Sequence, residues 1–333
     1  MSRAPDDESA LLRRLAAGPA SGDVLAREFG QTRAAVWKRI AALREAGVPI
    51  DAQPGLGYRL AAPLDLLDAA RIESGLPVPV REGLASLDVA WSLDSTSSEL
   101  LRREAPARGV AVLLAERQTG GRGRLGRLWA SPLGAHVYLS LARVFGGGLA
   151  RLGGLSLVAG IAAAEALHDL GCTQVQLKWP NDLVVEGERG LRKLGGVLVE
   201  GGGEHAGPVR AVIGLGLNVR MPPTAAEVID QPWCDLAALL PQAPERDVVV
   251  AALLTRLLPA LEAFDADGLA GFLPRYAQFD ALAGRAVRVH AAGTAIDATA
   301  LGLADDGGLR VREADGRERC VYAGEVSVRR SGG

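Results

Sequence analysis

The residues best suited to chemistry lie between Gln118 and Arg127, a stretch that reads Q-T-G-G-R-G-R-L-G-R and holds four glycines and three arginines. Glycine lets backbone N–H groups approach a ligand closely, and arginine adds a fixed positive fork of donors, so the stretch suits a phosphate. It is not a Walker loop, because the lysine and hydroxyl residue that end such a motif are missing. Taken alone, it is equally consistent with a flexible, solvated basic loop.

A second stretch, Lys178-Trp179-Pro180-Asn181-Asp182, follows the apolar alternation of Val175 and Leu177, which predicts a strand running into a turn. Its lysine is unusual in this chain, since only Lys38, Lys178 and Lys193 are lysines among 37 basic residues. A compact ammonium group acts in ways that a planar guanidinium does not, which is a physical reason to keep lysine at a reacting centre. Chance survival of a few lysines is the alternative interpretation.

Together with Asp94-Ser95-Thr96-Ser97 upstream, the two stretches resemble the biotin protein ligase family, in the bifunctional form that is also the biotin operon repressor. The resemblance covers nearly the whole chain. A helix-turn-helix pattern comes first and a short all-β tail comes last. Between them the family's motifs occur in order as D-S-T-S, Q-T-G-G-R-G-R-L-G-R, K-W-P-N-D, R-K-L-G-G-V-L-V-E and G-L-G-L-N.

The elements that must position these motifs begin with a winged helix-turn-helix pattern. Helices are predicted at 8–17, 22–29 and 33–46, and two short strands follow them. Four basic residues and one acidic residue give segment 31–47 a charge of +3, whereas the whole chain carries −2. This local surplus favours operator DNA as a partner over a helical domain with solvated basic residues. The residues predicted to meet DNA are Gln31, Thr32, Arg33, Trp37, Lys38 and Arg39.

Beyond this domain, strand and helix patterns do not form a strict strand–helix repeat, so we expect a mixed, mainly antiparallel sheet with helices packed on it. From Gly284 the chain alternates in short strands, which predicts a small all-β domain similar to the family's SH3-like cap. A single-stranded nucleic-acid platform is the alternative, but this segment lacks stacking aromatics. The predicted fold is therefore α+β, with a winged-helix domain at 1–62, a catalytic domain at 63–280 and an SH3-like domain at 281–333.

The resemblance implies a two-step reaction: the biotin carboxylate attacks the α-phosphate of ATP, and a lysine of a biotin carboxyl-carrier protein then attacks the biotinyl-5'-AMP. Because a carboxylate and a triphosphate repel each other, cations must lie between them, and Mg²⁺ would share this work. The implied catalytic residues are Lys178, Arg124 and Arg122. The implied biotin contacts are Ser95, Thr96, Ser97, Gln118, Arg122, Gly123, Arg124 and Lys178, and the implied nucleotide contacts are Arg124, Trp129, Asn181 and Asn218.

Several other residues, and the function itself, allow more than one interpretation. No protein residues are expected to form a metal site. Asp182 and Lys193 either support the reacting residues or form an ordinary surface ion pair. Ser97 replaces the asparagine that the family usually has, and Leu125 stands where other members can have a further basic residue. A lipoate-type ligase and a metabolite-sensing winged-helix regulator without ligase activity are the alternative functions.

Composition limits the class of protein and the cell compartment that we expect. The content of 48% hydrophobic and 23% charged residues is ordinary for a globular protein. Three widely spaced cysteines follow no metal or redox pattern, so we expect reduced packing residues in a cytoplasmic protein. The most apolar helical stretch, 152–164, is shorter than the ~18 residues of a membrane span, so no membrane partner is expected. Biotinyl-5'-AMP is expected to promote a homodimer that presents two basic helices to a two-fold operator.

Overall fold

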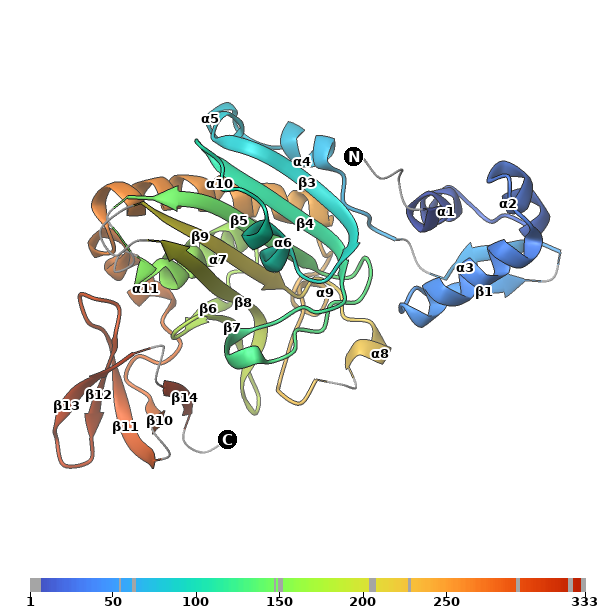
Figure 1. Cartoon of the computed structure of the whole chain (residues 1–333). Coiled ribbons are helices and arrows are strands. Elements are labelled where there is room, and N and C mark those ends of the chain that lie inside the picture. Colours follow the sequence, from blue (N-terminus) through green and yellow to red (C-terminus); the bar gives the residue numbers. More distant parts are fainter. Residues whose placement is uncertain are drawn as a thin grey trace.

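The structure is a computed structural model with three parts along the chain (Figure 1). The winged-helix part and the C-terminal sheet lie on opposite sides of a central sheet that is covered by helices. The predicted boundary between residues 62 and 63 lies outside the described residues. These are 7–53, 55–61, 64–146, 148, 152–203, 208–226, 229–291, 294–322 and 326–330.

The N-terminal part has the helices and the wing that the sequence predicts. Ser21 Oγ accepts from Val24 N at 3.2 Å and begins the second helix, and Thr32 begins the third in the same way. Gly57 is needed where the wing meets the helices, because a Cβ there would lie 2.3 Å from the Ala20 carbonyl oxygen. The elements are α1 (Asp7–Ala16), α2 (Gly22–Glu28), α3 (Arg33–Glu45), β1 (Ile50–Gln53) and β2 (Gly57–Leu60).

The central sheet has seven strands in the order β3-β4-β5-β9-β8-β7-β6 within the described chain. Only the β3–β4 pair is parallel among its pairs, so the predicted mixed, mainly antiparallel sheet is confirmed. The predicted turn at K-W-P-N-D is present, but sequence reasoning missed β7, the strand that begins directly after it. The strands are β3 (Leu84–Leu93), β4 (Val110–Gln118), β5 (Val137–Phe145), β6 (Val175–Lys178), β7 (Asp182–Gly187), β8 (Gly190–Gly203) and β9 (Val209–Leu217).

Helices cover this sheet, and the most apolar of them, α7, is buried on nearly every side, as its sequence predicts. It packs against the long helix α10. Within the described residues, no helix is long and apolar enough to cross a membrane. The helical segments are α4 (Ala69–Ser74), α5 (Val78–Glu82), α6 (Thr96–Arg102), η1 (Arg124–Gly126), α7 (Leu155–Asp169), α8 (Pro223–Ala226), α9 (Leu236–Leu239), α10 (Arg246–Asp267), η3 (Ala270–Phe272) and α11 (Leu273–Phe279).

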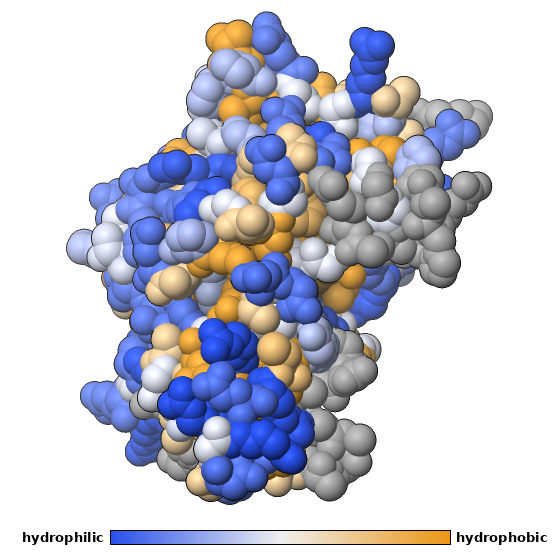
Figure 2. Space-filling model, turned by 90° about the vertical axis from the view of Figure 1, so that its left-hand side faces the viewer, coloured by the Kyte–Doolittle hydropathy of each residue, from blue (hydrophilic) through white to orange (hydrophobic). Residues whose placement is uncertain are grey.

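The C-terminal part is a five-stranded antiparallel sheet in the order β13-β12-β11-β10-β14. Its exposed arginines pair with carboxylates, as in Arg288–Asp297 at 2.8 Å and Arg310–Glu318 at 3.0 Å. Figure 2 shows a mainly hydrophilic surface at this lower end of the molecule. Paired charges, with Tyr322 as the one exposed Phe, Tyr or Trp ring among the described residues of this part, do not favour the nucleic-acid platform. The strands are β10 (Ala286–Ala291), β11 (Thr294–Leu303), β12 (Leu309–Glu313), β13 (Glu318–Val321) and β14 (Val326–Arg330).

The three cysteines are free, but they do not share one environment. Cys172 and Cys234 are buried as predicted, and burial raises the pKa of their thiols to about 11 and about 12, respectively. Cys320 is exposed, so the prediction that it packs in a core was wrong. It lies on β13, an edge strand where alternate residues face away from the core.

His136 is fully buried, and this burial lowers the pKa of its imidazole to about 3. Its Nδ1 accepts from Val219 N at 3.1 Å. Because the folded pKa lies below the unfolded value of about 6.5, the neutral ring stabilises the fold above that pH, and this stability is lost as pH falls toward 3. His136→Asn keeps an acceptor but does not titrate. Urea unfolding at pH 7.5 and pH 5 measures the free energy of unfolding. This free energy should fall by about 2 kcal/mol more in the wild type than in the variant over that range. Equal losses would contradict the prediction.

Candidate functional site

Uncharged polar side chains gather where α6 begins beside β4 and β5. Ser95 caps α6, and the Thr96 backbone N–H donates to Gln118 Oε1 at 2.8 Å. The hydroxyl oxygens of Thr96 and Ser97 lie 2.7 Å and 3.0 Å from Ser140 Oγ. The four serine and threonine residues are buried. Sequence reasoning missed Ser140, because a lone serine in an apolar strand carries no motif. This end of the site offers donors and acceptors without net charge.

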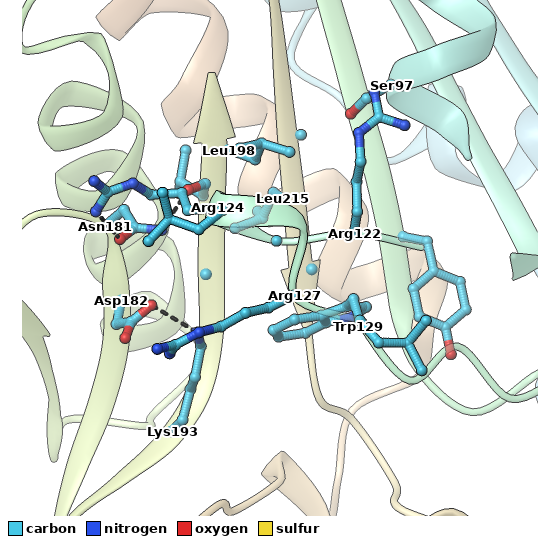
Figure 3. A pocket seen from close by; sticks show the side chains of 18 of the residues that line it. Ser97, Arg122, Arg124, Arg127, Trp129, Asn181, Asp182, Lys193, Leu198 and Leu215 are labelled. Carbon is cyan, nitrogen blue, oxygen red and sulfur yellow. Dashed lines mark hydrogen bonds and ion pairs between the residues drawn. The ribbon is translucent and has the colours of Figure 1, made fainter. Parts of the chain in front are cut away.

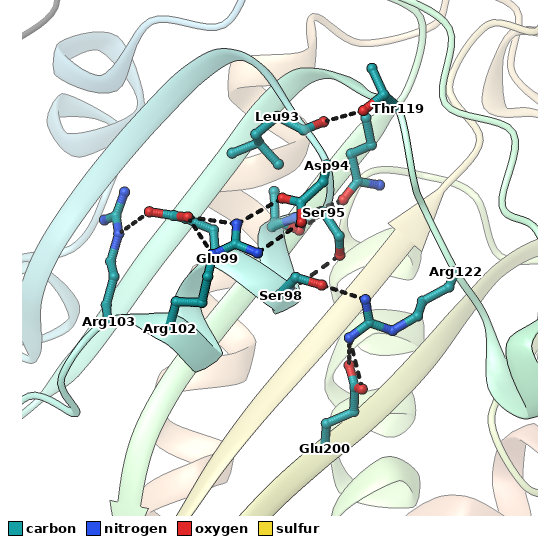
Figure 4. A network of polar contacts seen from close by, with 12 residues as sticks. Leu93, Asp94, Ser95, Ser98, Glu99, Arg102, Arg103, Thr119, Arg122 and Glu200 are labelled. Atoms are coloured by element: carbon teal, nitrogen blue, oxygen red, sulfur yellow. Dashed lines mark hydrogen bonds and ion pairs between the residues drawn. The ribbon is translucent and has the colours of Figure 1, made fainter.

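The glycine-arginine loop is attached to the same helix (Figure 4). Arg122 donates through Nη2 to both carboxylate oxygens of Glu200, at 2.9 Å and 3.1 Å, and through Nη1 to Ser98 Oγ. Behind it, Arg102 holds Asp94 with two bonds of 2.8 Å and keeps the pKa of that carboxyl low, at about 2. The structure therefore places Arg122 against β8. Glu200, its partner there, was not among the predicted site residues.

Arg124 extends from the loop to the turn that follows β6 (Figure 3). Its Nη1 donates to Asn181 Oδ1 at 3.3 Å, and Asn181 Nδ2 donates to the Val197 carbonyl at 2.7 Å. Burial lowers the pKa of the Arg124 guanidinium. The next residue, Leu125, has a φ of 57°, which is rare for leucine and turns the loop outward. Two motifs that are far apart in sequence thus meet side by side.

Lys193 and Asp182 form a partly buried ion pair, with Nζ and Oδ1 2.7 Å apart and exposed fractions of 19% and 22%. Lys193 Nζ also lies 5.5 Å from the ring centroid of Trp129, within cation–π range. A Cβ on Gly216 would lie 2.5 Å from that ring, which explains a glycine at this place in G-L-G-L-N. The predicted ion pair is therefore present, and both of its residues line a pocket.

These groups surround one pocket with a volume of about 170 Å³. All eight predicted biotin contacts line it, together with Trp129 and Asn181. Asn218 does not, because its Nδ2 donates to the Cys234 carbonyl at 3.0 Å inside the domain. Asp182 is the one carboxylate among the described lining residues. Their cationic side chains are Arg122, Arg124, Arg127, Lys178 and Lys193.

The predicted DNA-contacting residues lie at and near the start of α3. Trp37 is 59% exposed, an unusual position for a large apolar ring, and Thr32, Arg33 and Lys38 are exposed as well. Gln31 and Arg39 are half-buried. Arg44, which contributes to the local positive charge, donates to the Ile50 carbonyl at 2.8 Å and so ties α3 to the wing.

The fold and the site define a protein ligase with a helix-turn-helix domain in front. Residues 90–218 match the Biotin/lipoate A/B protein ligase family, residues 8–59 match a helix-turn-helix (HTH) domain, and residues 283–329 match the biotin protein ligase C-terminal domain. The chain is similar to the bifunctional ligase/repressor BirA of Salmonella typhimurium, with 39% identity over 93% of each chain. It belongs to the family of bifunctional ligase/repressors.

Two further comparisons agree with this assignment. The bifunctional ligase/repressor BirA of Escherichia coli is 38% identical, over 93% of this chain and 92% of that protein. A biotin protein ligase from Aquifex aeolicus, solved in complex with biotin and ATP, superposes with a TM-score of 0.61 at 26% identity. That superposition covers 74% of this chain and 100% of the other.

Proposed function

We propose that this protein joins biotin to a lysine of a biotin carboxyl-carrier protein in two steps. In the first, a biotin carboxylate oxygen bonds to the α-phosphorus of ATP, and pyrophosphate leaves. In the second, the lysine ε-amine attacks the acyl carbon of biotinyl-5'-AMP, AMP leaves, and the amine loses a proton. The observation that carries this proposal is a single pocket lined by five cationic side chains and one carboxylate, beside buried, uncharged polar groups.

The two ends of the pocket suit the two halves of the intermediate. The ureido ring of biotin is uncharged and both donates and accepts, so the hydroxyls of Ser95, Thr96 and Ser97 and the amide of Gln118 match it. Lys178 and Arg124 are proposed to meet the carboxylate and the α-phosphate. Fixed cations there stabilise the negative charge that grows during transfer.

The nucleotide is proposed to bind among Arg124, Asn181 and Trp129, which line the same pocket. The Trp129 ring offers an apolar surface to a base or an acyl chain, and its buried Nε1 has no hydrogen-bond partner among the described residues, so it suits a ligand acceptor. Among these residues no group of three or more His, Cys, Asp or Glu is arranged to hold a metal. Mg²⁺ often binds through one or two carboxylates and the substrate's phosphates, and Asp182 would be its carboxylate in this pocket.

The reaction is tested by incubating the full chain with biotin, ATP, Mg²⁺ and a carrier domain, and then weighing the carrier by mass spectrometry. We expect a mass increase of one biotinyl group, and pyrophosphate release that requires biotin. Labelling only with lipoate would favour a lipoate-type ligase. Binding of biotin without pyrophosphate release would favour a metabolite-sensing regulator.

Arg124→Gly is expected to loosen the intermediate more than it slows its formation. Loss of a charged hydrogen-bond donor costs about 1.5–3 kcal/mol, or roughly 10- to 100-fold in retention of biotinyl-5'-AMP. The released anhydride would then label exposed lysines of a bystander such as serum albumin, which mass spectrometry detects. Arg108→Gly, at an exposed loop arginine outside the pocket, is the control. Equal bystander labelling by both variants would argue against a role for Arg124.

The repressor half of the proposal rests on the exposed surface of α3. Lys38→Ala should weaken binding to a duplex selected by the wild-type protein about 3- to 10-fold, and should lower the slope of log affinity against log salt by about one. Ligase activity should not change, since Lys38 is far from the pocket in sequence and is not among its lining residues. Fluorescence anisotropy at several salt concentrations measures both quantities. Arg81→Ala, on α5, is the control, and an unchanged salt slope for Lys38→Ala would exclude a phosphate contact.

The ligand is proposed to control assembly as well. A glycine-rich loop loses much entropy when it is ordered, so biotinyl-5'-AMP that orders it also changes the surface beside it and promotes a sheet-to-sheet homodimer. Analytical ultracentrifugation with and without biotin and ATP tests this, alongside gel shifts. A ligand-independent monomer that never binds DNA would remove the repressor role. We also propose that the three domains span residues 1–62, 63–280 and 281–333.

A further inference from the structure

The end of β6 and the turn that follows it carry Lys178 and Asn181, and three contacts from other parts of the chain hold this segment. The Ala281 N–H donates to the Leu177 carbonyl at 2.9 Å, just before the lysine. Just after it, the indole Nε1 of Trp179 donates to the Gly307 carbonyl at 3.0 Å, in a buried contact. The Ser156 hydroxyl, on α7, donates to the Pro180 carbonyl at 3.4 Å. The Leu177 backbone before Lys178 and the Trp179 side chain after it are therefore held by segments more than 100 residues further along the chain.

The Gly307 carbonyl is itself rigidly presented by a turn of the C-terminal sheet. Gly307 N donates to the Ala304 carbonyl at 2.9 Å, and Ala304 N donates to the Gly308 carbonyl at 2.8 Å. Asp306 Oδ1 accepts from Gly308 N and its Oδ2 accepts from Tyr322 Oη, both at 3.0 Å. The acceptor for the tryptophan is thus fixed before any ligand arrives.

This turn fits closely against the catalytic part of the chain. Gly307 has a φ of 85°, and a Cβ there would lie 3.0 Å from both Leu157 Cδ1 and Leu269 Cδ2. An ion pair of 2.6 Å between Arg285 and Glu186, on β7, supports the same junction. Among the described strands, β6 is the edge of the central sheet and is only four residues long, so its own ladder constrains it weakly. Contacts from the C-terminal part supply the missing constraint.

We propose that Trp179 and Gly307 are positioning residues for the ligase reaction: their hydrogen bond fixes the backbone from which Lys178 and Asn181 reach the pocket. The inference rests on the proposed function and adds to it a task for the C-terminal sheet, which contributes no residue to the described pocket lining. Displacement of a catalytic group by about 1 Å can cost up to 10²-fold in rate, so a small movement at this junction is enough to matter.

Trp179→Phe removes the donor and keeps an aromatic ring, and it is expected to lower kcat for biotinyl-5'-AMP formation about 10-fold. The KM for biotin should stay within about threefold, because the ureido ring is proposed to bind the hydroxyl groups at the start of α6, which this turn does not carry. Gly307→Ala should act in the same way. Its matched control is Gly316→Ala, in the same sheet, where φ is 86° but a Cβ meets nothing within 4 Å. Calorimetric titration with biotin counts intact sites, so a fall in kcat is separated from loss of folded protein.

The double variant Trp179→Phe/Gly307→Ala gives a further readout. If both residues act through one hydrogen bond, its kcat should be close to that of the worse single variant, and the two losses should not multiply. The inference is overturned if Gly307→Ala keeps kcat within twofold of the wild type, or if Gly316→Ala loses as much. Should Trp179→Phe fail to fold, the glycine pair decides alone. A wild type that makes no biotinyl-5'-AMP would overturn the proposed function itself, whereas an active wild type with unaffected variants overturns only this inference.

Discussion

Lys178→Ala is expected to slow formation of biotinyl-5'-AMP by about 10²-fold or more. Preorganised positive charge at a developing anion is worth about this much, because water that replaces the ammonium must reorient during the reaction. Lys193→Ala should cause a loss of the same order. Asp182 already holds the Lys193 ammonium in place at 2.7 Å, and that ammonium lines the same pocket.

Single-turnover formation of biotinyl-5'-AMP with labelled ATP measures the effect, and Lys38→Ala is the control, since Lys38 is the remaining lysine of the chain. Comparing the two pocket lysines assigns their roles. Substitution of the lysine that touches the reacting carboxylate should lower kcat more than it raises the KM for ATP. Wild-type turnover in both variants would place the reacting centre elsewhere.

Arg246→Met is expected to lower the free energy of unfolding by about 3–5 kcal/mol, the usual cost of leaving a buried charge without its partner. Arg246, at the start of α10, is 1% exposed, and its Nη2 lies 2.7 Å from Glu116 Oε2 in the sheet. It also donates through Nη1 to the His136 carbonyl at 3.1 Å and through Nε to the Asp65 carbonyl at 2.7 Å. One guanidinium thus joins a strand, a helix and two connecting segments.

Urea unfolding, followed by circular dichroism, measures this change. Arg256→Met is a matched control on the same helix, because the Arg256–Asp169 pair has a similar distance of 2.7 Å but side chains 44% and 50% exposed. Exposed pairs of this kind contribute about 0–1 kcal/mol. Equal destabilisation by the two substitutions would show that the buried network contributes no more to the free energy of unfolding than the exposed ion pair does. In the double variant Arg246→Met/Glu116→Leu, part of the lost stability should return, since the unpaired carboxylate is removed.

Local sequence determined the elements and the order of the motifs. Ser21 and Thr32 begin helices as their side chains predict, and the alternation that ends at Lys178 is a strand. These features depend on neighbours in the chain, whose spacing a helix or strand sets directly. The family resemblance, carried by the same local motifs, accounts for the prediction of one pocket that holds Arg122, Arg124 and Lys178.

Tertiary structure decided which of these residues meet and which are only structural. Asn218 and Lys193 both lie in recognisable motifs. The Asn218 amide binds a backbone carbonyl inside the domain, whereas the Lys193 side chain lines the pocket. Ser140 carries no motif and joins the hydroxyl cluster only because β5 passes beside α6. Periodicity shows that a face is buried but does not identify its partner, because the partner is chosen by packing between segments far apart in the chain.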